Sequence, residues 1–389
     1  MKNLCSTFSK ALIITGILML TVSCTFTRRY VFLNFPDVYD YKKLPSRTLN
    51  NDSLKLFNFN TARGTELNSV LPFSFHSRTV NNLSAFLEQT GTTAFLIIRN
   101  DTILYEGYFN GHNRDTYCKS FSASKVFVSA LIGIAIDEGL IESVNDPVMK
   151  YLPEIKDKRL ADMTINHCLS LTSGIKSTKK EVFPWHDKVK IYYTRDIRKL
   201  VTNINYGHDP GKEYSVEEFS PVILAMVIEK VTGASVSKYL EEKIWKPLGM
   251  TSKAIWVTDR KKDGFEAANS GLTALPVDFA KFGRLYLNKG KFENKQLISE
   301  KWIKESTPPD TASLTFWRNI EHYENKDVYF NSMWWGLRNA NGDYEYSASG
   351  HFGQRIYIAP SRNSILVRFG TKDGDVDWTS VMMKLAEKL

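Results

Sequence analysis

A serine stands three residues before a lysine at the start of a strongly apolar segment. Ser122 and Lys125 belong to the sequence Ser-Ala-Ser-Lys, which runs into the apolar residues 126–136. Residues three apart on a helix lie on the same side, so the lysine amine can reach the serine hydroxyl. A serine hydroxyl becomes a good nucleophile only when a base removes its proton. The pair therefore predicts nucleophilic catalysis by Ser122, with Lys125 as its base.

Context distinguishes this pair from other Ser-x-x-Lys sequences in the chain. The same spacing begins at Ser173, Ser177 and Ser235. Only the copy at Ser122 opens a segment that is apolar on every side, which predicts a buried helix whose first turn faces a cleft. A buried lysine holds its proton less tightly than a solvated one, which suits a base. The alternative is an ordinary N-cap serine beside a solvated lysine.

Two pairs of β-rich segments flank a long helical region. Residues 93–99 and 102–108 surround a turn, as do residues 354–359 and 364–369, and each pair predicts a β-hairpin. Between them the apolar spacing predicts helices, among them 221–231 and 276–287, and residues 378–389 suit a closing amphipathic helix. The pattern predicts an α/β fold of the α+β kind. An antiparallel sheet built from both chain ends would be flanked by helices, with a cleft between the sheet and a helical insertion.

The first 23 residues have the pattern of an export signal. Lys2 and Lys10 precede an apolar stretch at 11–20, and Cys24 follows the signal. The stretch is shorter than the roughly 20 residues that a spanning helix needs. It resembles a bacterial lipoprotein signal with Cys24 as the lipidated residue, although Thr21 stands where leucine is usual. We expect a lipid anchor in a membrane of the cell envelope, with the protein facing the periplasm or the exterior. An uncleaved anchor helix is the alternative.

The rest of the chain divides into a leader and one large domain. Residues 24–79 show no sustained periodicity and predict an extended leader, whereas residues 80–389 have the length and apolar content of a single domain. The chain carries 51 basic and 42 acidic side chains, a formal net charge of +9. Because the charge is scattered and no long basic run with interleaved aromatics occurs, we expect no nucleic-acid partner.

The cysteines and histidines do not suggest a cofactor. Beyond the signal and Cys24, the chain holds Cys118 and Cys168, which we expect to be buried thiols, although one disulfide between them is the alternative. His167 has no companion ligands at metal spacing, and no glycine-rich phosphate loop occurs. The sequence therefore predicts neither a metal nor a cofactor.

A series of further short motifs follows Ser122 along the chain. After the segment around Ser122 come Leu171-Thr172-Ser173-Gly174, Pro210-Gly211, Pro247-Leu248-Gly249-Met250 and Gly350-His351-Phe352-Gly353-Gln354. With its motifs in this order, the chain resembles the family of β-lactamase-related serine hydrolases, which includes class C β-lactamases, D-alanyl-D-alanine carboxypeptidases, related esterases and nylon-oligomer hydrolases. The resemblance spans nearly all of residues 80–389. It implies a β-lactamase/transpeptidase-like fold and hydrolysis through an acyl-enzyme.

The same resemblance implies roles for individual residues. Ser122 would be the acylated nucleophile, and Lys125 its partner in proton transfer. His351 and Gly353 stand where the family carries Lys-Thr-Gly or His-x-Gly, on the strand that lines the cleft. The backbone N–H groups of Gln354 and Ser122 would form the oxyanion hole, which stabilises the charge of the tetrahedral intermediate. For His351 the alternative is a histidine of the core or of a loop.

The chain departs from the family at its second motif, Tyr-x-Asn or a relative. Gap-free spacing between the flanking Pro-Gly and Thr-Gly pairs places Val216 at the tyrosine position and Glu218 at the asparagine position. Tyr214 lies two residues earlier, on the same side of an extended segment, and could reach the cleft or simply cover the core. Glu217 and Glu218 also suit the first turn of a helix, where acids complement the helix dipole.

Three interpretations of this departure remain open. Tyr214 replaces the family tyrosine, or Lys125 with a water or Glu218 suffices, or the protein has lost turnover and kept a ligand-binding cleft. Aromatic side chains that border the cleft by resemblance could hold substrate or simply pack; they are Trp185, His186, Tyr192 and Tyr193.

The favoured function is an exported serine hydrolase that acts on a small ester, a D-amino-acid peptide or a short amide. Penicillin turnover is less expected, because it demands a well-placed deacylating group. The alternative is a non-catalytic protein of the same fold that binds cell-wall peptide or a partner in its cleft.

Overall fold

The computed structural model describes residues 29–30, 32–62, 71–75, 78–177, 186–309, 328–339 and 341–389. The predicted signal and Cys24 lie outside the described residues, and so does Trp185.

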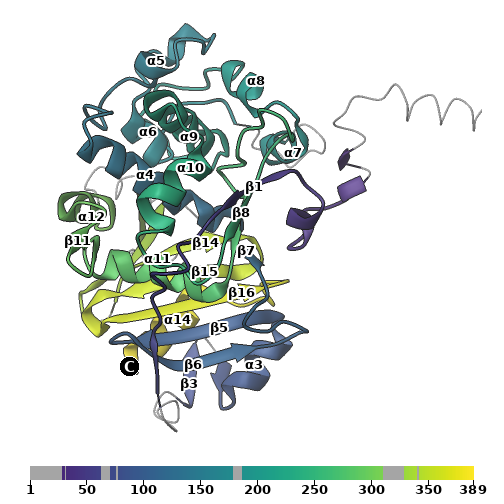
Figure 1. Ribbon diagram of the computed structural model, residues 1–389, viewed down its shortest axis with the longest axis vertical. Helices are drawn as coiled ribbons and strands as arrows, with labels where there is room; N and C mark the ends of the chain where they lie inside the picture. Colours follow the sequence, from purple (N-terminus) through teal and green to yellow (C-terminus); the bar gives the residue numbers. More distant parts are fainter. Residues whose placement is uncertain are drawn as a thin grey trace, which may run out of the picture.

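The largest sheet joins segments from both ends of the chain (Figure 1). Its eight strands have the order β12-β13-β14-β15-β16-β5-β6-β2. The first predicted hairpin is formed by β5 (Thr92–Arg99) and β6 (Thr102–Tyr108), and the second by β15 (Gln354–Ala359) and β16 (Ser364–Gly370). Both hairpins are confirmed, and β16 pairs antiparallel with β5, so that they meet inside one sheet.

The other strands of this sheet extend both of its edges. All pairs are antiparallel except that of β2 with β6, which is parallel. The remaining strands are β2 (Asn60–Thr61), β12 (Val328–Asn331), β13 (Trp334–Arg338) and β14 (Tyr344–Gly350).

A second sheet brings part of the predicted leader onto the domain. Its strand order is β1-β8-β9-β7, and β1 pairs with β8 over all four of its residues. A short 3-10 turn, η1 (Asp40–Lys42), precedes β1, and β3 and β4 form a separate hairpin just before the predicted start of the domain. The strands are β1 (Ser46–Leu49), β3 (Phe73–Phe75), β4 (Arg78–Val80), β7 (Cys118–Lys119), β8 (Ala254–Val257) and β9 (Leu272–Ala274).

Helices cover both faces of the large sheet because its strands are apolar on both sides. Ile356 and Ile358 belong to the core that includes α11 (Pro276–Leu287), whereas the alternating Tyr357 and Ala359 belong to the core around α14 (Trp378–Glu387). This alternation follows from the two-residue period of a strand. Both helices lie where the sequence predicts them.

Two helices at the centre of the fold are apolar on every side. In α4 (Lys125–Asp137) all residues from 125 to 135 are buried, and α9 (Phe219–Thr232) packs against it. A helix without a polar face must be enclosed by its neighbours, as the sequence predicts for the segment after Ser122. No single described helix is long and apolar enough to cross a membrane. Together, α9 and the following helical segment 236–245 have the length and composition of a span, but they are bent by 77° relative to each other.

The remaining helices gather mostly at the end of the molecule away from the sheet (Figure 1). They include the predicted helical insertion between the two hairpins. The helices are α3 (Leu83–Gln89), which packs on β5, then α5 (Val148–Tyr151), α6 (Ile165–Leu169), α7 (Asp187–Tyr193), α8 (Ile197–Thr202), α10 (Val236–Leu240) and α12 (Glu300–Ser306).

Candidate active site

Ser122 lies in a short 3-10 turn, η3 (Phe121–Ser124), directly before α4. Ser122 is partly exposed, whereas Ala123 after it is buried. The end of β14 comes very close to this turn, because a Cβ added at Gly350 would lie 2.3 Å from the carbonyl oxygen of Ser120. Only glycine allows the strand to approach so closely. The sheet therefore supports the backbone that presents the serine.

Phe121, the residue before Ser122, has an uncommon backbone conformation. Its φ is 47°, in the left-handed region that bulky residues rarely adopt. The ring packs edge-on against His351 and Phe352, with centroid distances of 5.7 and 5.5 Å. The amine nitrogen of Lys119 lies 4.5 Å from the centre of the same ring. Contacts on several sides thus hold the strained turn and join it to the His-x-Gly motif.

Lys125 forms a buried ion pair with Glu218. The Nζ of Lys125 lies 3.2 Å from Oε2 of Glu218, and their side chains are 8% and 6% exposed. The amide nitrogen of Asn269 donates a hydrogen bond of 3.0 Å to the same carboxylate oxygen. The lysine of the Ser-x-x-Lys motif therefore has a charged partner that is 93 residues away in the chain.

Glu218 is ionised at neutral pH despite its burial. Burial by itself raises the pKa of a carboxyl, but the charge of Lys125, the amide of Asn269 and the charge of Lys188 outweigh it and lower the pKa of Glu218. The side chain makes no cap hydrogen bond to α9. The interpretation of Glu218 as an acid that merely complements the helix dipole is thus wrong, because its carboxylate binds the lysine instead.

Glu217 behaves as the sequence predicts for a helix terminus. Its carboxylate accepts hydrogen bonds from the backbone N–H groups of Phe219 and Ser220, with distances of 3.0 and 2.9 Å from the nitrogen of Ser220. Ser173 donates a weaker bond of 3.4 Å. Burial nevertheless raises the pKa of Glu217. The adjacent acids therefore have separate tasks: one caps α9 and the other faces Lys125.

The two candidate side chains of the second motif, Val216 and Tyr214, differ in burial. Val216 is 53% exposed. The ring of Tyr214 packs edge-to-face on Phe330 of β12, with centroids 5.8 Å apart, and its hydroxyl oxygen is shielded from solvent. The expectation that this ring covers the core is confirmed. A role for Tyr214 in proton transfer stays a prediction.

The His-x-Gly motif forms a tight turn, η6 (His351–Gly353), between β14 and β15. Phe352 and Gly353 both have positive φ, 60° and 74°. The backbone N–H of Gln354, predicted for the oxyanion hole, is donated to the carbonyl of His351. An oxyanion can use this N–H only by displacing that carbonyl.

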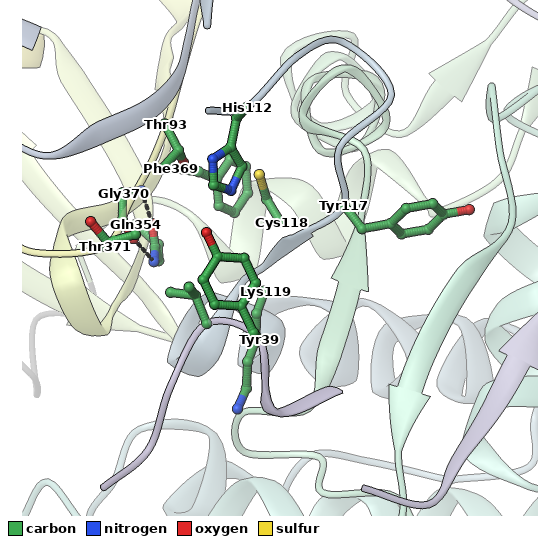
Figure 2. Close-up of a pocket in the computed structure, with 11 residues that line it drawn as sticks. Tyr39, Thr93, His112, Tyr117, Cys118, Lys119, Gln354, Phe369, Gly370 and Thr371 are labelled. Carbon is green, nitrogen blue, oxygen red and sulfur yellow. Dashed lines mark hydrogen bonds between the residues drawn. The ribbon is translucent and has the colours of Figure 1, made fainter. Parts of the chain in front are cut away.

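The side chain of Gln354 binds the backbone of Gly370. Its Nε2 donates to the carbonyl of Gly370 at 2.8 Å, and the N–H of Gly370 donates to its Oε1 at 2.7 Å (Figure 2). This pair of bonds ties the first residue of β15 to the end of β16. The leader residue Tyr39 lies beside it and stacks on His112, lining a narrow hollow of about 10 Å³ with Gln354 and Lys119 (Figure 2).

Arg368 holds the His-x-Gly turn from inside the molecule. Its fully buried guanidinium donates to the carbonyls of Phe352 and Gly353 at 2.7 and 2.9 Å, and it lies 3.8 Å from the centre of the Trp378 ring. Burial lowers the pKa of Arg368 to about 9. A Cβ at Gly353 would lie 2.6 Å from this guanidinium, so a glycine is needed there. Arg368 thereby positions the backbone next to Gln354.

The imidazole of His351 is neutral at neutral pH. Burial lowers its pKa and the positive charge of Lys188 lowers it further; Asp373 raises it, and Lys119 lowers it again. Where the family carries lysine or histidine, this chain therefore presents an uncharged ring that can donate or accept a hydrogen bond.

Lys119 links the turn that holds Ser122 to the leader. Its buried Nζ donates to the hydroxyl of Tyr192 at 3.2 Å and to the backbone carbonyl of Asp37 at 3.4 Å. Tyr192 in turn donates to the fully buried carboxylate of Asp40. Burial lowers the pKa of Lys119 to about 8. Tyr192 thus takes part in a polar network at the border of the site.

Residues 80–382 match the sequence profile of the beta-lactamase family. The chain belongs to the beta-lactamase family. A 6-aminohexanoate-dimer hydrolase from Paenarthrobacter ureafaciens is 25% identical over 301 residues, which cover 75% of each chain. Two proteins with solved structures share the fold of this chain.

A Bacillus anthracis protein assigned to the 6-aminohexanoate-dimer hydrolases superposes with a TM-score of 0.75 at 21% identity, over 90% of this chain and 91% of that one. A D-stereospecific amidohydrolase from Streptomyces gives a TM-score of 0.58 at 19% identity, over 77% of this chain and 95% of that one. At these identities the likeness establishes the fold, which is β-lactamase/transpeptidase-like as the sequence predicts.

The other Ser-x-x-Lys copies lie outside the family's motif and have structural roles. Ser235 is the N-cap of α10 and accepts a hydrogen bond of 3.3 Å from the backbone N–H of the exposed Lys238. Ser173 binds Glu217, and its lysine, Lys176, is exposed. The lysine that follows Ser177 lies outside the described residues. Burial of the lysine is therefore the feature that separates the family motif from the chance copies that the structure describes.

Two further expectations concern cysteines and metals. Cys118 and Cys168 are free and buried, which confirms the predicted pair of thiols. Burial raises the pKa of both, that of Cys118 to about 12. Within the described ranges, no group of three or more His, Cys, Asp or Glu side chains is placed to hold a metal ion.

Sequence reasoning missed several residues of the site. Asn269, Lys119, Asp40 and Arg368 carry no motif of their own, and each acts through a partner far away in the chain. The gap-free spacing that placed Glu218 at the family's asparagine position was the one signal that pointed toward the Lys125 pair.

Proposed function

We propose that this beta-lactamase family member is a serine hydrolase that forms an acyl-enzyme on Ser122. The observation that carries the proposal is the buried ion pair of Lys125 and Glu218, with 3.2 Å between Nζ and Oε2, one helical turn after a partly exposed serine. A buried pair of opposite charges costs desolvation energy, and such pairs cluster at functional sites.

In this proposal the ion pair accepts the serine proton as a unit. The Oγ of Ser122 attacks a carbonyl carbon, its proton passes to Lys125, and Lys125 releases a proton to Glu218. The oxyanion is bound by the N–H groups of Ser122 and Gln354, the latter after it leaves the carbonyl of His351. The leaving alcohol or amine takes its proton back from the pair. Water then hydrolyses the acyl-enzyme, with the pair again as base.

The proposed substrates are small esters, short amides and D-amino-acid peptides. The relatives named as a 6-aminohexanoate-dimer hydrolase and a D-stereospecific amidohydrolase support the amide and D-peptide classes. The rings of His351 and Phe121 pack together next to the serine, with centroids 5.7 Å apart, which suits an uncharged acyl group. A panel of p-nitrophenyl esters, D-alanyl peptides, the 6-aminohexanoate dimer and benzylpenicillin ranks these classes directly.

Labelling with a fluorophosphonate probe tests the nucleophile. We expect an adduct on Ser122, located by peptide mass spectrometry, which disappears in Ser122→Ala. The matched control is Ser235→Ala, which removes the serine of another Ser-x-x-Lys sequence and should leave labelling unchanged. If Tyr214→Phe loses labelling, Tyr214 performs the proton transfer of the family tyrosine. If its labelling is unchanged, proton transfer is assigned to Lys125 and Glu218.

The non-catalytic alternative is supported by one observation. Val216, at the position of the family tyrosine, cannot transfer protons and is exposed. Folded protein that is never labelled at Ser122, yet binds cell-wall peptide equally well with and without Ser122→Ala, would establish this alternative and overturn hydrolysis.

We further propose that the protein is exported and anchored by a lipid on Cys24. The support is the sequence pattern of the first 24 residues. Cells fed an alkyne fatty acid should label the wild-type chain and not Cys24→Ala, and the mature N-terminus should begin at residue 24. An unlabelled chain that retains its first residues would contradict the anchor.

A further inference from the structure

A basic hollow lies where the described chain begins. Its volume is about 670 Å³. Five cationic side chains line it, together with four apolar residues, and none of the described residues that line it is acidic. The cations are Arg29, Lys42, Lys43, Arg195 and Lys261; the apolar residues are Phe32, Leu33, Leu44 and Pro45.

The cations come from three distant parts of the chain, so the fold assembles the cluster. Arg29 is fixed by its guanidinium, which donates to the backbone carbonyls of Thr194 and Asp259. Burial lowers the pKa of Arg29, and the charge of Arg195 lowers it further, against the opposing charge of Asp259. Lys43 is paired with Asp40 at 3.0 Å. Like charges held this close in a hollow repel one another, and an anion relieves that repulsion.

The hollow lies beside the start of the predicted anchor. Only four residues separate Cys24 from Arg29, which limits the distance between their Cα atoms to about 18 Å. In Figure 1 the first described residues, in purple, lie next to α7, in agreement with the bond between Arg29 and Thr194. A membrane that holds a lipid on Cys24 is therefore within reach of the hollow.

Exposed aromatic side chains of the same segment also suit a membrane surface; Phe32 lines the hollow, and Phe35 follows three residues later. Phe32 is 74% exposed and Phe35 is 71% exposed. Aromatic side chains beside a cluster of lysine and arginine are typical of segments that lie at the boundary between headgroups and acyl chains. Arginine and lysine bind the phosphate groups of such headgroups directly.

We propose that this hollow binds the phosphate groups of anionic phospholipid headgroups and holds the body of the protein against the membrane. The choice of lipid over free phosphate rests on the proposed anchor, whereas the site itself depends neither on the anchor nor on catalysis. Bound in this way, the leader and α7 lie close to the bilayer, and the anchor and the hollow act together.

Calorimetry on the full chain in neutral detergent tests the site. The probes are dihexanoylphosphatidylglycerol, which is anionic, dihexanoylphosphatidylcholine, which has no net charge, and inorganic phosphate. We expect phosphatidylglycerol to bind at least about tenfold more tightly than either of the others, and its affinity to fall as salt is added. Equal binding of the two lipids would overturn the proposal. If inorganic phosphate binds as tightly as phosphatidylglycerol, the hollow is a site for free phosphate, and the proposal of a lipid ligand is overturned.

A double variant gives the proposal a residue-specific test. Lys42 and Lys261 are exposed, so Lys42→Gln with Lys261→Gln should fold normally. Each basic residue near an anionic surface contributes about a fivefold change in affinity, so the pair should weaken phosphatidylglycerol binding about 25-fold.

The matched control removes two positive charges elsewhere. Lys301→Gln with Lys304→Gln changes α12, on the opposite side of the molecule in Figure 1, where the two lysines are 79% and 68% exposed. Equal effects of the two double variants would overturn the proposal. Labelling of Ser122 should be the same in both, which separates failure of this site from failure of the hydrolase.

Discussion

At the scale of single residues, the charges around Ser122 decide how its proton can leave. Glu218 is ionised and lies against Lys125, so neither group acts alone. Asn269 holds the carboxylate from the other side. In the proposed mechanism the pair therefore accepts the serine proton together, and the carboxylate is the group that distinguishes this chain from a motif with asparagine.

The variant Glu218→Gln tests the carboxylate. It keeps the size of the side chain but leaves the buried lysine without an opposite charge, so we expect a loss of stability of about 3 kcal/mol. Loss of half of the proton-transfer pair should slow fluorophosphonate labelling about 100-fold. Labelling kinetics and urea unfolding measure the two effects. A wild-type labelling rate would show that Lys125 acts without the carboxylate, as in a motif with asparagine.

Lys119 predicts a dependence of stability on pH. Its pKa in the folded protein is about 8, against an ordinary value of 10.5, because burial disfavours the charged amine. Below pH 8 the amine is charged in both states, and the folded state bears the full cost of burying it. As the pH rises from 8 to 10.5, the folded protein loses this proton before the unfolded chain does, and the cost disappears.

The measurement compares wild type with Lys119→Met, which has no such charge. Relative to the variant, the wild type should become more stable by about 2 kcal/mol between pH 7.5 and pH 9.5. Urea unfolding of both proteins at the two pH values gives this difference, and other titrating groups cancel. A constant difference across the range would show that the amine keeps its proton.

At the scale of elements, a strand end and two turns position the reaction centre. The end of β14 supports η3 through Gly350, and Arg368 supports η6 through the carbonyls of Phe352 and Gly353. The ring of Phe121 lies between the two turns. A displacement of either turn therefore moves the serine relative to the predicted oxyanion hole.

The variant Gly350→Ala tests this support. Its Cβ would lie 2.3 Å from the carbonyl oxygen of Ser120, so the turn before α4 must shift. Because misplacement of reacting groups by about 1 Å can cost about 100-fold in rate, we expect labelling to slow by that order. The control is Gly139→Ala, which has a positive φ of 72° but no atom within 4 Å of the added Cβ. The role of Gly350 would be contradicted if Gly350→Ala were labelled as fast as wild type, or if Gly139→Ala were also labelled more slowly.

At the scale of the whole molecule, the leader is part of the structure around the site. Asp40 is fully buried and accepts hydrogen bonds from Tyr192 and Lys43, while β1 pairs with β8 along its whole length. The predicted boundary at residue 80 coincides with the start of the family match. Residues before it nevertheless complete the small sheet and enclose Lys119.

We expect Asp40→Asn to loosen this attachment. It removes the negative charge that faces Lys119 and Lys43 and leaves Asp37 as the remaining acid near the buried Lys119, which should cost about 2 kcal/mol. Thermal unfolding and the rate of limited proteolysis within residues 32–45 measure the effect. Asp52→Asn is the control, because the carboxylate of this partly exposed leader acid accepts a hydrogen bond only from the nearby backbone N–H of Leu54 among the bonds described for it. Equal rates of proteolysis in the two variants would contradict the role of Asp40 in attaching the leader to the domain.

The amino-acid sequence by itself determined the local features of this protein. The two hairpins, the buried helix after Ser122 and the capping role of Glu217 all follow from two-residue and three-to-four-residue periods and from turn chemistry. Such patterns act between neighbours in the chain, so they can be recognised without knowing the fold.

Only the tertiary structure decided which distant groups meet at the site. Three contacts join residues that are at least 15 positions apart. Lys125 pairs with Glu218, Arg368 donates to the carbonyls of the His-x-Gly turn, and Lys119 donates to a carbonyl of the leader. Spacing placed Glu218 at a motif position, but an isolated chain does not show whether its carboxylate faces a helix terminus or a lysine. Packing of α4 against α9 settled this, because it buries both charges together and leaves each as the other's partner.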